Sequence, residues 1–343
     1  MQVQLVEKII AEWASSNANT LGLDPKPIKA SYIFNPGGFG NLSVRLTDGR
    51  TQLHVKLAPR SNAARLQQWA SVSDYLAENY TAPKLVHIIE DEIVPEYAYG
   101  LVFEYIEQAT PLMEAPNPEF ALTGVIETIA KLHRDERLSG MLPKAETRTY
   151  AEAFEDEYIT RFTEDLEEIR SSRELLRDFV SDETIVWFGD EIQRLRDIVR
   201  HTPAFLHPAS DVVHNDLNSN NVLTCDNYSF RIIDWDDLTG QGDAAMDYSV
   251  LLWPLTKYPS WSVWRDKVRA EAGTATLERL ELYFRAKLLD DVIDVLADYV
   301  EAEKVPEHRE EAQRTARAVH LHSYPQYLAK YGFDSGQHFG TKK

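Results

Sequence analysis

The sequence predicts an α+β protein with two lobes, a small antiparallel sheet followed by a mainly helical part. The chain has 343 residues, which is enough for two lobes around one cleft. Short runs of alternating apolar residues fill the first third, with the hairpin signal Asp48-Gly49 among them. Apolar residues at helical spacing dominate the remainder. We therefore expect one lobe over 1–106 and a helical lobe over 107–343.

The first lobe begins with an amphipathic segment that is typical of a helix. Alternation then predicts strands over 30–34, 42–46 and 52–57. A helix is expected over 61–79, because its apolar residues recur on one face. A second pair of strands is expected over 84–89 and 97–105. Long acidic helices are expected between residues 151 and 200.

The stretch from Val212 to Asp247 contains the polar residues that indicate the type of reaction. Two short apolar strands, 212–213 and 230–233, bring Asp216, Asn221 and Asp234 to one place. Phosphoryl transfer needs a carboxylate to orient the acceptor hydroxyl, and an Asn with an Asp to hold Mg²⁺ against the phosphates. Each of these residues alone is a common turn former. Together, at these spacings, they favour phosphoryl transfer.

A glycine-rich turn between the first two expected strands supports the same chemistry. It contains Gly37, Gly38, Gly40 and Asn41. Backbone N–H groups in such a turn approach phosphates closely, and Lys56 on the third strand is placed to meet the α- and β-phosphates. A glycine-rich turn is also common in loops that bind nothing. It indicates a phosphate site here only in combination with Lys56.

The run from His214 through Asp216 to Asn221, followed by Asp234, resembles the catalytic loop and metal-binding Asp of kinases. The sequences His-Asn-Asp and Ile-Asp-Trp-Asp resemble the aminoglycoside phosphotransferase and choline kinase superfamily more than the protein kinases. The chain also runs from Asp234 directly into the Asp-rich segment that begins at Asp243, which leaves no room for an activation loop. Protein substrates are therefore not expected.

This resemblance, which spans Pro36 to about Leu252, implies a protein-kinase-like bilobal fold and phosphorylation of a hydroxyl on a small molecule by ATP or GTP. It implies that Asp216 is the base or acceptor-orienting residue, that Asn221 and Asp234 bind Mg²⁺, and that Lys56 contacts phosphate. The expected adenine contacts are the main chain of a hinge formed by Phe103, Glu104, Tyr105 and Ile106. Asp236 and Asp237 are expected either to support the site residues from behind or to lie near the acceptor.

One departure from the kinase pattern concerns the partner of Lys56. Kinases pair this lysine with a Glu on the following helix. Here the inward positions of the expected helix are Gln67, Gln68 and Trp69. The sequence leaves three alternatives for the partner of Lys56, which are Asp234, a glutamine, or a carboxylate from elsewhere in the chain.

Composition restricts the partners and the location. A net charge of −19 argues against nucleic acid and favours a cationic small molecule. The N terminus lacks the basic and apolar regions of a signal peptide, no stretch is long enough to span a membrane, and one cysteine cannot form an internal disulfide. We expect a cytoplasmic monomer or homodimer in which Cys225 is a small buried residue. Motifs of zinc and serine hydrolases are absent from the sequence.

The acceptor is not decided by the sequence. The acidity suits an aminoglycoside, and so an antibiotic kinase that confers resistance. The two loop motifs are at least as similar to choline and ethanolamine kinases, and macrolide and thiamine kinases share the scaffold. A catalytically silent nucleotide-binding protein is an alternative of another class, because the helix Glu is missing.

Overall fold

The structure is a computed structural model that describes residues 3–24, 27–33, 40–144, 146–225, 229–304 and 309–332. Its contacts divide the chain into two compact units. The first contains Met1–Ala145 and Asp211–Gln241, and the second contains Glu146–Ser210 and Gly242–Lys343. The expected strand Lys and the expected catalytic loop thus belong to the same unit. A lobe boundary at residue 106 stays a prediction.

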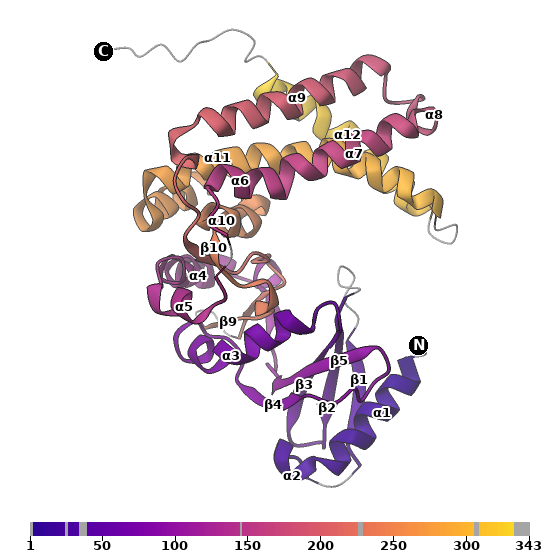
Figure 1. Ribbon diagram of the computed structural model, residues 1–343, viewed down its shortest axis with the longest axis vertical. Helices are drawn as coiled ribbons and strands as arrows, with labels where there is room; N and C mark the ends of the chain where they lie inside the picture. The colour runs from indigo at the N-terminus through magenta and orange to yellow at the C-terminus, as the bar shows by residue number, and fades with distance from the viewer. Residues whose placement is uncertain are drawn as a thin grey trace. The chain divides into compact units, whose positions relative to one another are not determined.

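A five-stranded antiparallel sheet in the order β1-β2-β3-β5-β4 forms the base of the first unit (Figure 1). Its strands are β1 (Lys29–Ile33), β2 (Leu42–Thr47), β3 (Gln52–Pro59), β4 (Leu85–Ile89) and β5 (Tyr97–Glu104). The strands expected from the sequence are confirmed within about two residues at each end. Thr47 pairs with Gln52 across the predicted hairpin, and Gly49 adopts φ +91°, a conformation that glycine tolerates best.

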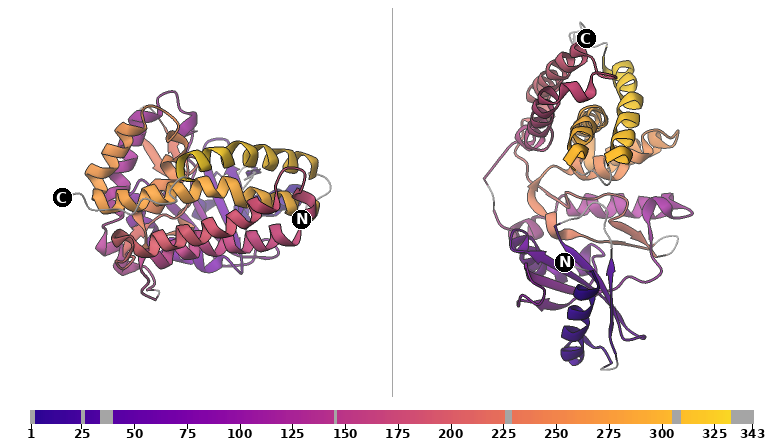
Figure 2. Two further views of the ribbon diagram at one scale, coloured as in Figure 1. Left: turned by 90° about the horizontal axis from the view of Figure 1, so that it is seen from above. Right: turned by 90° about the vertical axis from the view of Figure 1, so that its right-hand side faces the viewer.

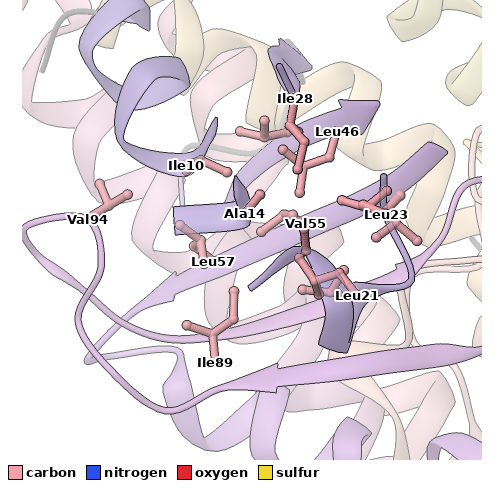
Figure 3. Close-up of a cluster of buried hydrophobic side chains, with 14 of the residues drawn as sticks. Ile10, Ala14, Leu21, Leu23, Ile28, Leu46, Val55, Leu57, Ile89 and Val94 are labelled. Atoms are coloured by element: carbon pink, nitrogen blue, oxygen red, sulfur yellow. The ribbon is translucent and has the colours of Figure 1, made fainter. Parts of the chain in front are cut away.

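Helices cover both faces of this sheet. On one face, α1 (Val3–Ser16) buries Ile10 and Ala14, and α2 (Ala18–Leu21) buries Leu21. These residues share one hydrophobic cluster with Val55 and Leu57 of β3 (Figure 3). Side chains alternate along a strand, so Lys56 points to the opposite face. There α3 (Ala63–Asn79) packs its residue Trp69 on Phe103 of β5, with ring centroids 4.4 Å apart.

The first unit is completed by short elements that carry the predicted loop. A three-stranded sheet has the order β6-β8-β9, and β10 pairs with β7. The elements are β6 (Thr110–Pro111), a 3₁₀ turn (Leu112–Glu114), α4 (Pro118–Leu132), α5 (Glu136–Met141), β7 (Asp211–Val213), β8 (Val222–Thr224), β9 (Phe230–Ile232), a 3₁₀ turn (Trp235–Asp237) and β10 (Thr239–Gly242). The hydroxyls of Tyr75 and Tyr80 donate to Asp135 at 2.8 and 2.5 Å, and Asp135 caps α5. The C-terminal end of α3 is thereby fixed to α5.

The second unit is helical, as expected. Its elements are α6 (Tyr150–Phe154), a π-helical turn (Glu155–Ile159), α7 (Thr160–Ser171), α8 (Arg173–Leu176), α9 (Asp182–His201), a 3₁₀ turn (Pro203–Phe205), α10 (Ala244–Leu252), a 3₁₀ turn (Trp253–Leu255), α11 (Trp261–Glu301), a 3₁₀ turn (Ala302–Lys304) and α12 (Arg309–Tyr331). Helices α7, α9, α11 and α12 lie side by side (Figures 1 and 2). A kink at Gly273, where φ is +86°, divides α11.

A buried polar network joins three helices of this unit. Glu191 of α9 accepts hydrogen bonds from Arg285 of α11 and from the hydroxyl of Tyr327 of α12, both at 2.5 Å. Arg285 also donates to the Tyr327 hydroxyl at 3.0 Å. All three side chains are buried. Because an unpaired buried charge is strongly destabilising, this network favours one relative placement of the helices.

Two expectations from composition are tested by the described residues. None of their helices has both the length and the apolar character needed to cross a membrane. Cys225 is exposed, so the expectation of a buried cysteine was wrong. The physical reason is its position directly after the last residue of β8, outside the strand, where its backbone N–H donates to the Ser229 carbonyl at 3.0 Å.

A cluster of carboxylates lies between α7 and α11. Burial raises the pKa of Asp165 to about 7, and the nearby Asp294, Asp290 and Asp298 add to the rise, against the effect of Arg161. Arg161 is ion-paired with Asp290. The folded protein therefore binds the Asp165 proton more tightly than the unfolded chain does. Its contribution to stability is fully present below the ordinary pKa of 3.8 and is lost as the pH rises to about 7.

We expect Asp165→Asn to stabilise the protein at pH 8, by about 1–2 kcal/mol because partial exposure reduces the effect. At pH 4 the two proteins should be nearly equally stable. Denaturant unfolding at both pH values measures this, with the exposed neighbour Glu164→Gln as control. An equal gain at both pH values would contradict the assignment of the pH dependence to Asp165.

Candidate active site

The predicted catalytic loop is braced by His214, which is fully buried at the end of β7. Its Nδ1 accepts the backbone N–H of Asp216 at 3.3 Å, and its Nε2 lies 2.9 Å from the carbonyl of Ile233. Because Nδ1 accepts a hydrogen bond, the ring hydrogen is assigned to Nε2. His214 therefore fixes the backbone of the loop relative to the end of β9.

Asp216 and Asn221 lie in direct contact. The Asn221 side-chain amide donates to Asp216 Oδ2 at 2.8 Å and to the Asp216 carbonyl at 2.7 Å. Asn218, which the sequence reasoning did not single out, donates to Asp216 Oδ1 at 2.8 Å. Two amides thus orient one carboxylate, while the side-chain oxygen of Asn221 remains an acceptor.

The ladder between β8 and β9 brings Asp234 next to Asn221. Val222 pairs with Ile232, and the N–H of Ile233 donates to the carbonyl of Asn221 at 2.9 Å. The structure therefore brings Asn221 into contact with Asp216 and places Asp234 one residue after Ile233, which bonds to the Asn221 backbone. Asn221 and Asp234 offer oxygen atoms, the donor type that Mg²⁺ prefers.

Two residues of this site have left-handed backbone conformations. Both Asn215 and Asp234 adopt φ +69°. Asn and Asp tolerate this region better than other residues with side chains, yet it is uncommon and often marks functional sites. Asn215 also donates to the carbonyl of Asp237 at 2.8 Å, which ties the catalytic loop to the turn after β9. The reading of His-Asn-Asp as a motif did not predict this contact.

Lys56 is buried against that turn. It forms ion pairs with Asp234 and, at 3.0 Å, with Asp236. Burial alone would lower the pKa of the Lys56 ammonium, but these two carboxylates outweigh it and raise the pKa. Burial likewise opposes ionisation of Asp234, yet the charge of Lys56 lowers the pKa of that carboxyl below its ordinary value.

Asp236 and Asp237, expected on the acceptor side, make ion pairs within the first unit. Asp236 binds Lys56, and its second oxygen accepts from the side chain of Asn41 at 2.7 Å. Burial raises the pKa of Asp236 against the effect of Lys56, and the neighbouring Asp234 adds to the rise. Asp237 is ion-paired with Arg65 of α3.

The helix α3 supplies no carboxylate to Lys56. Its acidic residues Asp74 and Glu78 are exposed. Trp69 instead places its ring 5.5 Å from the Lys56 ammonium, which is within the range of a cation–π contact. Gln68 donates to the carbonyl of Leu238 at 2.5 Å. The open question of the Lys56 partner is thus answered by the turn after β9.

The glycine-rich turn is described only in part, since Gly37 and Gly38 lie outside the described residues. A Cβ at Gly40 would come within 2.7 Å of the Asn62 side-chain amide nitrogen, so a side chain at this position would require Asn62 to move. Asn41 follows Gly40, directly before β2, and is linked to Lys56 through Asp236.

The expected hinge consists of the last two residues of β5 and the two residues after it. Phe103 is buried on Trp69, and Glu104 exchanges hydrogen bonds with Lys84 through its backbone N–H and its side chain. The N–H of Tyr105 donates to the carbonyl of Gln52 at 3.4 Å. The next residue, Ile106, is half-buried.

A family model described as the phosphotransferase enzyme family matches residues 31–289. The chain belongs to this family. It is therefore a phosphotransferase, as the resemblance in the loop motifs implied. No sequence among the curated proteins matches the chain significantly.

Solved structures of other phosphotransferases have the same fold at low sequence identity. The GDP complex of aminoglycoside 2'-phosphotransferase-IIIa is 14% identical with a TM-score of 0.58, over 87% of this chain and 93% of that one. Spectinomycin phosphotransferase with ADP and spectinomycin is 13% identical with a TM-score of 0.56, over 94% and 99%. Choline kinase from Streptococcus pneumoniae is 16% identical with a TM-score of 0.53, over 95% and 99%. The expected kinase-like α+β fold is confirmed.

The bracing by His214 leads to a prediction for this phosphotransferase. His214→Phe keeps an aromatic ring but leaves the Asp216 N–H and the Ile233 carbonyl without their partner. The free energy of unfolding should fall by about 1–3 kcal/mol for each group that remains unsatisfied. Chemical denaturation measures the fall, with the exposed His207→Phe as control. Equal, small effects of the two substitutions would show that the His214 hydrogen bonds do not stabilise the loop.

Proposed function

We propose that this phosphotransferase transfers the γ-phosphoryl group of ATP, or of GTP, to a hydroxyl of a small cationic molecule. The observation that carries the proposal is the meeting of Lys56, Asp216, Asn221 and Asp234 at one end of the β7, β8 and β9 strands. Lys56 contacts Asp234, Asn221 contacts Asp216, and the β8–β9 ladder joins the two pairs. Phosphoryl transfer requires this set of groups.

In the proposed mechanism Asp216 orients the acceptor hydroxyl and accepts its proton. The amides of Asn218 and Asn221 keep the carboxylate in one orientation for this task. Lys56 binds the phosphates as a positive charge on a buried strand. The backbone of the turn at Gly37, Gly38, Gly40 and Asn41 is proposed to bind phosphate as well, and the main chain of residues 103–106 to bind the base.

The oxygen donors of Asn221 and Asp234 fit Mg²⁺, which would neutralise charge on the phosphates when bound. Among the described residues there is no group of three or more His, Cys, Asp or Glu side chains that could bind a metal by themselves. Mg²⁺ commonly binds through one or two carboxylates and completes its coordination with water and nucleotide phosphates. A pair of protein ligands is therefore sufficient for this proposal.

For the acceptor, an aminoglycoside or a similar antibiotic is the first candidate, because the net charge of −19 favours a cation. Of the acidic residues over 155–168, several already have basic partners. Arg200 binds Glu155, Arg148 binds Asp156, and Lys304 binds Glu168. Long-range attraction by the acidic protein, more than these particular carboxylates, supports a cationic acceptor.

Choline and ethanolamine remain the second candidates, since the His-Asn-Asp and Ile-Asp-Trp-Asp motifs resemble kinases of this type and a choline kinase shares the fold. A catalytically silent nucleotide-binding protein is disfavoured, because all four residues are present, with Lys56 paired to Asp234 and Asn221 bonded to Asp216. ADP release across aminoglycosides, macrolides, choline, ethanolamine and thiamine distinguishes these possibilities. No release above background with any of them would disfavour the proposed activity on these acceptors.

The different roles proposed for Asp216, which orients the acceptor, and Asp234, which binds metal, can be tested by substitution. Asp216→Asn should lower kcat by about 10²–10⁴-fold, the usual range for a general base, and leave Mg-ATP affinity nearly unchanged. Asp234→Asn should lower both kcat and Mg-ATP affinity, because it removes a metal ligand and a partner of Lys56. Calorimetry and steady-state kinetics measure the two effects. If nucleotide binding falls equally in both variants, the assigned roles are wrong.

The charge of the acceptor is testable through salt. Attraction between exposed charges is screened over about 8–10 Å at 0.1–0.15 M ionic strength. Raising the salt concentration should therefore increase the KM of a cationic acceptor more than the KM of Mg-ATP, whose contacts are direct. We expect the best acceptor to carry at least one amine. If the best acceptor is uncharged, or if its KM does not respond to salt, the net charge no longer supports a cationic acceptor.

A further inference from the structure

The buried lysine of this enzyme is positioned by the turn after β9 and not by a helix. We propose that Asp236 is the positioning residue for Lys56, in the role for which kinases use a glutamate on the helix that corresponds to α3. This inference rests on the proposed function, because it assigns to Lys56 the binding of nucleotide phosphates. It differs from the expected acceptor-side role of Asp236.

The contacts of Asp236 support a positioning role. One of its carboxylate oxygens lies 3.0 Å from Lys56 Nζ, and the other accepts from Asn41 at 2.7 Å. Its side chain is 11% exposed, and that of Lys56 is 7% exposed. Both oxygens are thus used within the first unit. Asp236 links the strand that carries the lysine to the end of the glycine-containing turn.

The second partner of Lys56, Asp234, is the proposed metal ligand. An oxygen atom that binds Mg²⁺ is less available to an ammonium group. Asp236 then remains as the carboxylate that holds Lys56 while Asp234 is engaged. A single carboxylate could not serve both purposes equally well, which gives a physical reason for two acidic residues in this turn.

The same turn positions α3. Arg65 of the helix pairs with Asp237, and Gln68 donates to the carbonyl of Leu238. Trp69 occupies the side of α3 that faces Lys56, where its ring packs near the ammonium. A carboxylate on that side of the helix is therefore replaced by an aromatic ring, and the turn supplies the negative charge.

Calorimetric binding of ADP, with Mg²⁺ and with EDTA, tests this role. Asp236→Asn should weaken ADP binding by roughly 10–100-fold, a range typical of residues that orient a ligand-binding group. The factor should be similar with and without Mg²⁺. In a Lys56→Met background the same substitution should have little further effect, because non-additivity identifies residues that act through each other. Asp74→Asn, at an exposed position on α3, is the matched control.

Other roles for Asp236 give different results. A loss of affinity only in the presence of Mg²⁺ would make Asp236 a metal ligand. Unchanged ADP binding with a raised acceptor KM would make it an acceptor contact. Additive losses with Lys56→Met would show that it does not act through Lys56. Each of these outcomes overturns the proposal while the proposed function stands. Failure of the wild-type protein to bind ADP or GDP would instead overturn the proposed function.

Discussion

The site depends on one buried cluster of charges, in which Lys56 lies between Asp234 and Asp236. A buried ammonium is costly unless it is paired, and so are buried carboxylates. The pairing therefore connects strand β3 to a turn that is about 180 residues away in the sequence. The sheet and the catalytic loop of the first unit are joined through this cluster.

The turn from Asp234 to Leu238 is a point of attachment for several elements. Gln68 of α3 and Asn215 of the catalytic loop each donate to one of its backbone carbonyls. These bonds are made to backbone carbonyls, so they depend on the backbone conformation of the turn and not on its side chains. A change in that conformation would break them. The left-handed conformation of Asp234 is part of that shape.

The acidic residues of the chain have different physical roles. In the second unit, Glu191 is a buried carboxylate whose charge is balanced by Arg285, and it helps to fix three helices. Asp165 instead lies among other carboxylates, where burial raises its pKa to about 7 and its ionisation opposes folding. The net charge of −19 thus contains structural pairs, like-charge clusters and exposed carboxylates.

The sequence by itself determined the strands and the order of the elements, because alternation and turn residues are local properties, and the spacing of the loop motif led to the proposed roles of Asp216, Asn221 and Asp234. It did not determine which groups Lys56 and Asp236 contact. Those pairs form between segments far apart in the chain, and the sequence around Lys56 contains no signal for a partner in a distant turn. The exposure of Cys225 was missed for a similar reason, since burial depends on where the chain leaves a sheet. Only the tertiary structure decided that a turn, and not a helix, supplies the charge.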